Sequence, residues 1–441
     1  MESSNSWVKA RHHIVFLVGL FTALAIAFSI ETREYNQVMG NLSFAPSEQL
    51  PFRQTRVLTE QEYLWAKTAW QYFENNYQDN TGLVNSVDGY PSTTMWDTAS
   101  YLMALISAQR LNVISYEEFS LKTEKALNSL ARLPLVRDEL PNKAYNTQTL
   151  AMVDYNNQIV EGGIGWSAID IGRILVPMNI LIWQYPKFNR QVNAVLQHWQ
   201  ISAMTQDGYL YGARLSSNRE FELVQEGRIG YEEYASKALS LMGRDVFNAL
   251  KYADYLKFIN INGVDIPTDS RDPDKYHAHN YVVSESYILD SIEFGGDSIS
   301  KVFAYRVYKA QEERYKKLGV LTAVSEDHID QAPYFVYNTV FSDGKKWNAI
   351  TDTGDDASEF RTLSTKAAFG WYSLYDTPYA NNLIKGVNTL KSDKEGWYSG
   401  LYEKNGQINK TLTANTNGIV LESLAYIQSG ALLNIGVEAQ H

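Results

Sequence analysis

The sequence predicts an all-α fold, an (α/α) toroid behind an N-terminal transmembrane helix. Apolar residues recur every three or four positions along most of the chain, loops with a glycine and an aromatic residue separate these stretches, and one long apolar run lies near the N-terminus. A toroid buries an inner ring of helices inside an outer ring and gathers loops over a central cleft. The alternative is a stack of helical repeats, but no fixed period relates the helical stretches.

The predicted transmembrane helix covers residues 14–30, IVFLVGLFTALAIAFSI, which contain no charged side chain. As a helix this run would be roughly 26 Å long, close to the thickness of the hydrocarbon core of a bilayer. Lys9 and Arg11 precede the run and Glu31 follows it. The positive-inside rule therefore predicts that residues 1–13 are a cytoplasmic tail and that the rest of the chain is exported.

The apolar run has two possible fates. An uncleaved signal anchor is favoured, because the run is longer than the apolar region of about 7 to 15 residues in a signal peptide. The small-residue pattern Ala25-Ile26-Ala27 instead allows cleavage, which would release the protein. Residues 31–57 have neither helical nor strand periodicity and predict a polar connector, so the toroid domain is expected over residues 58–441.

The helical pattern begins with a capping box, Thr59-x-x-Glu62, followed by apolar residues along one helix face. A helix is predicted over residues 98–111, and a second capping box, Ser115-x-x-Glu118, opens the next helix to about residue 133. The same spacing predicts further helices over residues 168–184, 187–203, 231–254, 284–293, 298–318, 356–375, 378–391 and 416–429. Few stretches have the pattern of strands.

Composition narrows the classes of partner. The net charge of -11 argues against a nucleic-acid partner, which would need clustered Lys and Arg. The chain has no Cys and its seven His are scattered, so no metal site and no cofactor are expected. Phosphate-binding loops, dinucleotide fingerprints and nucleophile elbows do not occur in the sequence, which argues against nucleotide-dependent enzymes and α/β-hydrolases. The 30 Tyr and 10 Trp suggest a surface that contacts a ligand, or half-buried packing.

Carboxylates cluster at expected helix starts and in one polar, aromatic stretch, residues 140–173. Glycoside hydrolysis needs two carboxyl groups across one bond, with aromatic side chains holding the sugar rings. Our first choices for the acid and base are Glu233 and Asp170. Helix starts also attract carboxylates for capping, so a structural role is the alternative. The further candidate acids are Glu285, Asp154, Glu161 and Asp97, and the candidate substrate-binding residues are Trp96, Tyr145, Asn146, Tyr155, Trp166, Tyr231 and Glu232.

The segments TTMWDTASYLMAL, LPNKAYNT and GIGWSAIDIGRIL resemble a bacterial family of unknown function found in envelope proteins, from about Gln61 to the C-terminus. More distantly, the chain resembles the endo-β-1,2-glucanases and the glucoamylase-like domain of cyclic β-1,2-glucan synthases. Asp170, Glu233-Tyr234 and the segment Ser284-Glu285-Ser286-Tyr287 carry this likeness. It implies an (α/α)6 toroid, whereas the residues around Glu233 depart from the glucanase pattern.

Together these features predict a membrane-tethered, extracytoplasmic glycoside hydrolase or processing factor for a β-glucan or exopolysaccharide. The alternative is a non-catalytic glycan-binding or scaffold protein of an envelope polysaccharide machine. The expected partners are an oligo- or polysaccharide, the membrane, and components of polysaccharide synthesis or export. The expected location is the bacterial inner membrane, crossed once, with the domain in the periplasm or outside the cell.

Overall fold

The computed structural model divides the chain into two compact units, residues 1–49 and 50–441. The described residues are 17–25, 50–215, 220–276 and 279–435. In the first unit, residues 17–25 form a helix. Searched along its described ranges, the chain has no helix that is both long and apolar enough to cross a membrane. The remainder of the predicted transmembrane run 14–30, including the last two residues of Ala25-Ile26-Ala27, lies outside the described residues, as do the predicted cytoplasmic tail and the connector up to residue 49.

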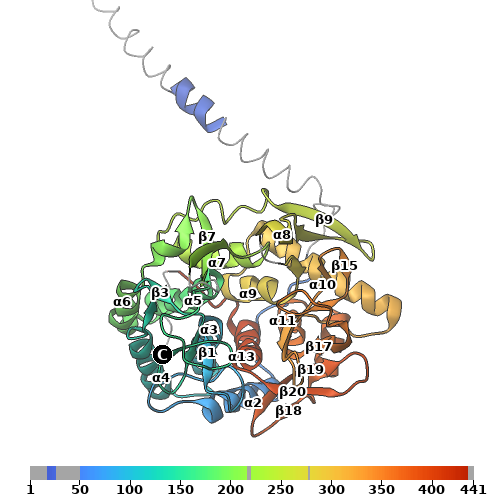
Figure 1. Ribbon diagram of the computed structural model, residues 1–441. Helices are drawn as coiled ribbons and strands as arrows, with labels where there is room; N and C mark the ends of the chain where they lie inside the picture. The colour runs from blue at the N-terminus through green and yellow to red at the C-terminus, as the bar shows by residue number, and fades with distance from the viewer. Residues whose placement is uncertain (1–16, 26–49, 216–219, 277–278, 436–441) are drawn as a thin grey trace, which may run out of the picture. The chain divides into compact units, whose positions relative to one another are not determined.

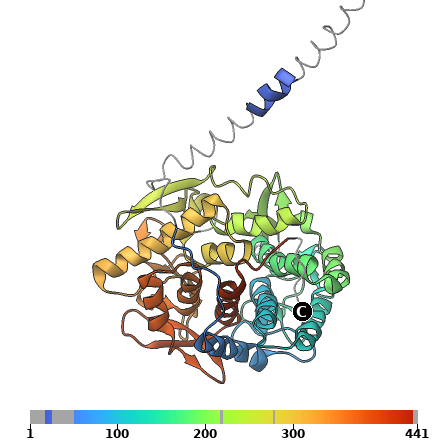
Figure 2. The same ribbon diagram turned by 180° about the vertical axis from the view of Figure 1, so that it is seen from behind.

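In the second unit a ring of helices surrounds the centre of the fold (Figure 1). Each inner helix contacts the next inner helix along the chain, and the last inner helix packs against the first. Within residues 50–435 these inner helices are α3 (Met95–Arg110), α5 (Ala168–Gln184), α7 (Tyr231–Leu241), α9 (Glu285–Phe294), α11 (Thr365–Leu374) and α13 (Ala414–Ser429). The view from behind shows the same ring (Figure 2).

An outer layer lies around the ring, and the chain alternates between the two layers as expected for an (α/α)6 toroid. The outer helices in the described part are α2 (Glu60–Asn76), α4 (Tyr116–Leu130), α6 (Asn189–His198), α10 (Ser298–Leu318) and α12 (Pro378–Val387). The short helix α8 (Pro273–Tyr276) lies between α7 and α9 along the chain.

Between α7 and α9 the outer layer contains the antiparallel hairpin of β9 (Leu256–Ile261) and β10 (Val264–Asp269), which packs against α10. A helix over residues 231–254 was predicted here, and this prediction was wrong for its second half. Helix α7 ends at Leu241, and Gly243 follows with a φ of 73°, a left-handed conformation that glycine adopts readily after a helix.

Short strands lead into most inner helices, so the prediction of few strands was wrong. They contain two to seven residues, too few for their alternation to stand out in the sequence. The other strands are β1 (Ser92–Thr94), β2 (Leu135–Val136), β3 (Leu140–Pro141), β4 (Ala144–Asn146), β5 (Met152–Val153), β6 (Thr205–Gln206), β7 (Tyr209–Leu215), β8 (Phe221–Gln225), β11 (Tyr281–Val282), β12 (Glu326–His328), β13 (Phe335–Asn338), β14 (Phe341–Ser342), β15 (Lys345–Lys346), β16 (Ala349–Ile350), β17 (Thr362–Ser364), β18 (Lys391–Ser392), β19 (Gly396–Tyr402) and β20 (Ile408–Leu412). The described strands form small antiparallel sheets, such as β1-β4-β5, β6-β7-β8 and β12-β13-β16.

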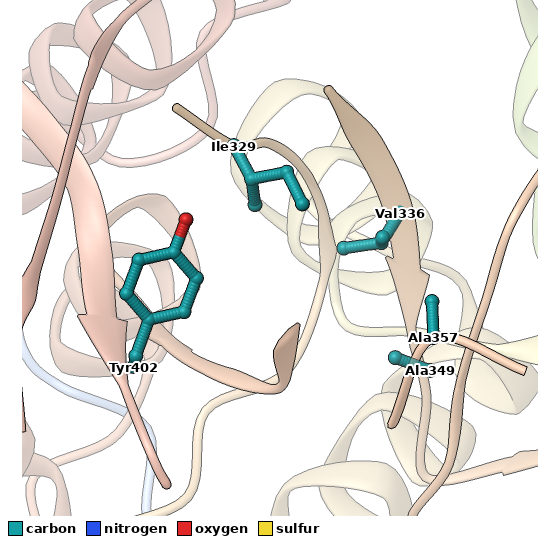
Figure 3. Close-up of a cluster of buried hydrophobic side chains, with 5 residues drawn as sticks. All are labelled: Ile329, Val336, Ala349, Ala357 and Tyr402. Carbon is teal, nitrogen blue, oxygen red and sulfur yellow. The ribbon is translucent and has the colours of Figure 1, made fainter. Parts of the chain in front are cut away.

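One of these sheets, β12-β13-β16, has an apolar core of its own (Figure 3). Ile329, Val336, Ala349 and Ala357 pack together with the ring of Tyr402 from β19. The hydroxyl of Tyr402 donates a hydrogen bond to Asp330 at 2.6 Å. This packing holds β12, from which Glu326 contacts Tyr231 of α7 and Asp327 contacts Ser364 before α11.

The chain enters the second unit along the C-terminal ends of two inner helices. Residues 50–57 were predicted as the end of a polar connector, but they belong to the folded unit. The backbone N–H of Arg53 donates to the carbonyl of Leu374, the last residue of α11, at 2.8 Å. The backbone N–H of Arg56 donates to the carbonyl of Ile427 in the last turn of α13 at 2.9 Å.

Candidate active site

The N-terminal ends of the inner helices meet on one face of the ring. The indole N–H of Trp96, at the start of α3, donates to Glu285 Oε1 at the start of α9, at 2.9 Å. The side-chain amide of Asn415, at the start of α13, donates to the same oxygen at 2.8 Å. Side chains from residues 96, 285 and 415 therefore converge although they are far apart in sequence.

Glu285 is the most enclosed carboxylate at this face, with an exposed fraction of 1%. It forms an ion pair with the buried Lys366 at the start of α11. Burial opposes ionisation, but the charges of Lys366 and Arg173 outweigh it and hold the pKa of Glu285 below its ordinary value. Glu285 is therefore ionised, with hydrogen bonds to Oε1 and an ion pair with Lys366.

Asp170, in the first turn of α5, is half-buried. The hydroxyl of Ser167 donates to Asp170 Oδ1 at 3.0 Å and accepts the backbone N–H of Asp170 at 3.1 Å, so Ser167 caps the helix as the sequence predicts. Burial, followed by the negative charge of Glu226, raises the pKa of Asp170 from 3.8 to about 7. A large fraction of the Asp170 carboxyl is therefore protonated at neutral pH and can donate a proton.

Glu226 was not among the predicted site residues. It follows β8 and reaches the start of α5, where it accepts the backbone N–H groups of Ala168 and Ile169, the latter at 3.4 Å. A Cβ atom on Gly212 would lie 2.7 Å from Glu226 Oε2, so the glycine makes room for this carboxylate. Burial raises the pKa of Glu226, while Lys143 counteracts this effect. The only sequence signal is its place before Gly227 in an acidic, glycine-containing turn.

Strand β12 contributes further titratable groups that the sequence analysis missed. Glu326 accepts a hydrogen bond from the hydroxyl of Tyr231. Asp327 accepts one from Ser364 at 3.1 Å, and burial, despite the nearby Lys366, raises the pKa of Asp327 to about 8. Three successive titratable residues, Glu326 to His328, were the available signal, but the sequence does not reveal that they lie at the ring.

Glu233, a first choice for catalysis, lies at the start of α7 and caps its own helix. One of its oxygens accepts the backbone N–H of Gly230 at 2.7 Å. Burial, reinforced by the charge of Glu232, raises the pKa of Glu233 well above its ordinary value. Glu232 forms a buried ion pair with Arg271 at 2.7 Å. Both glutamates therefore have structural partners, and no contact of either with Asp170 is observed among the described residues.

The remaining predicted acids lie in different settings. Asp97, buried in the first turn of α3, accepts the hydroxyl of Thr94 at 2.9 Å. Its charge acts on both Asp170 and His328, so it belongs to the same face. Asp154 accepts two backbone N–H groups of its own turn at 2.9 Å, and Glu161 is exposed on the same loop. The site therefore includes Asp97, whereas Asp154 mainly closes a turn.

Three of the predicted sugar-binding aromatics are buried. Tyr145 and Trp166 are 0% and 1% exposed, and their polar atoms bond to backbone carbonyls. Neither ring has a free face for a sugar. Tyr231 is also buried, and Asn146 binds backbone N–H groups of its own loop. Glu232 is held by Arg271, as described above.

Other aromatics are open to solvent at this face. Trp96 is half-exposed, and Tyr155 is 64% exposed with its hydroxyl in electrostatic interaction with Asp170. Tyr281 and Tyr337, which the sequence analysis missed, are half-exposed and stack with ring centroids 4.3 Å apart. The accessible aromatic surface thus consists of Trp96, Tyr155 and this tyrosine pair.

A buried ionic cluster lies deeper in the ring. Arg173 of α5 is fully buried and bonds Glu293 of α9 at 3.0 Å and Glu422 of α13 at 3.4 Å. Arg173 also donates to Tyr234 of α7 at 2.9 Å. One cation thus connects four inner helices directly beneath the site.

The fold has counterparts among solved structures. An endo-β-1,2-glucanase from Chitinophaga pinensis, solved with sophorotriose and glucose, superimposes with a TM-score of 0.62 at 12% identity, covering 85% of this chain and 94% of that one. An endo-β-1,2-glucanase from Talaromyces funiculosus, solved with sophorose, has a TM-score of 0.57 at 11% identity and 84% coverage of both chains. A cellobiose 2-epimerase from Bacillus thermoamylovorans has a TM-score of 0.51 at 12% identity, covering 83% of this chain and 98% of that one. At these identities the likeness shows a shared fold.

No curated protein matches the sequence. The model of one family does match it, over residues 64–430, which contain the inner helices and every candidate site residue discussed above. The chain therefore belongs to the family described as "Protein of unknown function (DUF3131)".

Proposed function

We propose that the protein is a glycoside hydrolase acting on a β-glucan or a related exopolysaccharide, with its active site at the N-terminal ends of the inner helices. Asp170 carries this proposal, because it is a half-buried carboxyl whose pKa is raised to about 7 beside a second carboxylate, Glu226. A general acid works best when its pKa lies near the pH of the reaction.

Asp170 would donate its proton to the glycosidic oxygen as the bond to the leaving sugar breaks. Glu226 would keep Asp170 protonated before the reaction, because two negative charges at the start of α5 repel each other. Asp97 would act as the second carboxylate, since it belongs to the neighbouring helix α3 and its charge already acts on Asp170. In this role Asp97 would either accept a proton from water or stabilise the positive charge on the sugar.

The glycan would lie against the accessible aromatic surface. Trp96 and Tyr155 provide accessible apolar area at this face, and sugar rings stack on such surfaces. The proposal of a β-glucan substrate is supported by the endo-β-1,2-glucanases that share the fold, one solved with sophorotriose and one with sophorose. We further propose that the apolar run 14–30 tethers the protein to the inner membrane, so that the domain meets envelope polysaccharides and the components that make or export them.

The decisive experiment is a hydrolysis assay with β-1,2-glucan and a panel of bacterial exopolysaccharides. Asp170→Asn and Asp97→Asn should each lower kcat by about 10² to 10⁴-fold. Asp154→Asn is the matched control, since Asp154 closes a turn of the same region, and its kcat should stay close to that of the wild type. Wild-type rates in Asp170→Asn would refute the assignment.

A non-catalytic glycan-binding role is the second candidate. It is favoured by the finding that Glu232, Glu233 and Glu285 are each engaged by structural partners. Binding of a glycan without any product, in the wild type and in Asp170→Asn alike, would establish this alternative.

A further inference from the structure

Trp96 is held by two buried charged residues. Its indole N–H donates to Glu285 at 2.9 Å, and the guanidinium of Arg173 lies 4.7 Å from the centre of its ring. Both Glu285 and Arg173 are buried, whereas the indole is half-exposed. The side chain thus presents part of its ring to solvent from a fixed support.

The Glu285 side of this support is rigid. Glu285 accepts the amide of Asn415 at 2.8 Å and pairs with Lys366, and Lys366 donates to Asn415 Oδ1 at 2.8 Å. These residues start α9, α11 and α13, so three inner helices hold the carboxylate that holds the indole. A carboxylate with this set of partners has little freedom to move during a reaction.

The Arg173 side is restrained in the same way. Glu293 and Glu422 bind its guanidinium, and Tyr234 adds a further hydrogen bond. A guanidinium over an indole is attracted to the π-electrons of the ring, and this attraction strengthens where water is excluded. The orientation of the Trp96 ring is therefore fixed by Arg173 at the face of the ring and by Glu285 at the indole N–H.

We propose that Glu285, with Lys366 and Arg173, positions Trp96 as a rigid stacking surface for the apolar face of a pyranose ring, so that Glu285 determines glycan affinity and not the rate of bond cleavage. This inference rests on the proposed function and names the part of the site that binds sugar. A side chain already fixed in its bound orientation loses little conformational entropy on binding, which improves affinity. Glu285 thus has a different role from the catalytic one suggested for it from the sequence.

The test uses full-length protein and sophorotriose. Glu285→Gln keeps an oxygen that can accept the indole N–H but removes the charge that binds Lys366. In an Asp170→Asn background, its Kd for sophorotriose should rise at least about tenfold. In an otherwise wild-type background, KM for β-1,2-glucan should rise while kcat stays within about twofold. A loss of about 10² to 10⁴-fold in kcat with an unchanged Kd would instead make Glu285 catalytic and overturn the proposal.

A second variant, Trp96→Phe, decides the proposal if Glu285→Gln does not fold. Trp96→Phe keeps the buried Glu285–Lys366 pair but removes the N–H that Glu285 accepts, and it should weaken sophorotriose binding in the same direction. Combined with Glu285→Gln, it should weaken binding no more than the larger of the two single changes, because both disturb the same support of the indole ring. If the losses of binding free energy in the two single variants add in the double variant, Glu285 does not act through Trp96. Trp183→Phe, at a surface tryptophan near the end of α5, is the control and should bind as the wild type does.

The outcomes separate this inference from the proposed hydrolysis. If the wild type binds sophorotriose but cleaves no glycan, the hydrolase assignment fails, and the Kd values alone still decide the role of Glu285. If the wild type binds neither sophorotriose nor β-1,2-glucan, the stacking surface for these glucans is refuted.

Discussion

Replacing Asp170 with asparagine should stabilise the folded protein at neutral and alkaline pH, as well as lower the rate of the proposed catalysis. The folded chain holds the proton of Asp170 up to about pH 7, whereas the unfolded chain releases it near pH 3.8. Between these values rising pH therefore favours the unfolded chain. Below pH 3.8 the group is protonated in both states and has no effect.

The size of this effect follows from the pKa change. One pH unit corresponds to about 1.4 kcal/mol, so a rise from 3.8 to about 7 weakens the folded state by about 4 kcal/mol once the pH exceeds 7. Asparagine has no proton to lose and escapes this penalty. The free energy of unfolding of Asp170→Asn, relative to the wild type, should therefore increase from pH 4 to pH 8, with about 4 kcal/mol as the upper value.

Urea unfolding at a series of pH values between 4 and 8, followed by tryptophan fluorescence, measures this difference. Asp154→Asn is a suitable control, because Asp154 accepts two backbone N–H groups of its own turn and lies outside the ring. A stability difference between Asp170→Asn and the wild type that does not change with pH would show that the pKa of Asp170 is ordinary. The choice of Asp170 as general acid would then lose its physical basis.

Three further predictions concern the same face and its support. Glu226→Gln removes the charge that opposes ionisation of Asp170, so the alkaline limb of the rate against pH should move down by about one pH unit, and an unmoved limb would contradict the coupling. Arg173→Met leaves two buried glutamates without their cation and should lower the free energy of unfolding by about 3 to 5 kcal/mol in urea titrations. Gly165→Ala should cost at least about 2 kcal/mol, because φ is 112° and a Cβ would overlap a neighbouring strand, whereas Gly263→Ala, with a φ of 87° in open space, measures the backbone strain alone.

A helix could be predicted from the sequence where a capping residue marks its start and a glycine marks its end. Helix α10 has the predicted bounds 298–318, because Asp297 caps its first turn and Gly319 ends it with a φ of 71°. The predicted helix 231–254 failed in its second half, because the apolar pattern continues past Leu241 into residues 242–255, which form turns before β9. Periodicity reports which residues are apolar, and both a helix and a buried turn can contain such residues.

The candidate site could be predicted in part. Asp97, Asp170 and Trp96 stand at helix starts with clear caps, and the ring brings all three to one face. Glu226 and Asp327 could not be found in this way, because their importance depends on burial and on neighbours that are distant in the chain. Glu233 also stands at a helix start, but there its carboxylate caps α7 by accepting the backbone N–H of Gly230.

Residues 50–57 pack within the second unit on the side opposite to the candidate site. These residues bond to the C-terminal ends of α11 and α13, whereas the candidate site lies at the N-terminal ends of the inner helices. Any pull on the preceding chain would act on the side away from the site. A glycan could then approach the carboxylates without passing the attachment point, and the hydrogen bond from the backbone N–H of Asp376 to the carbonyl of Pro51 would be the first to bear the force, followed by those of Arg53 and Arg56.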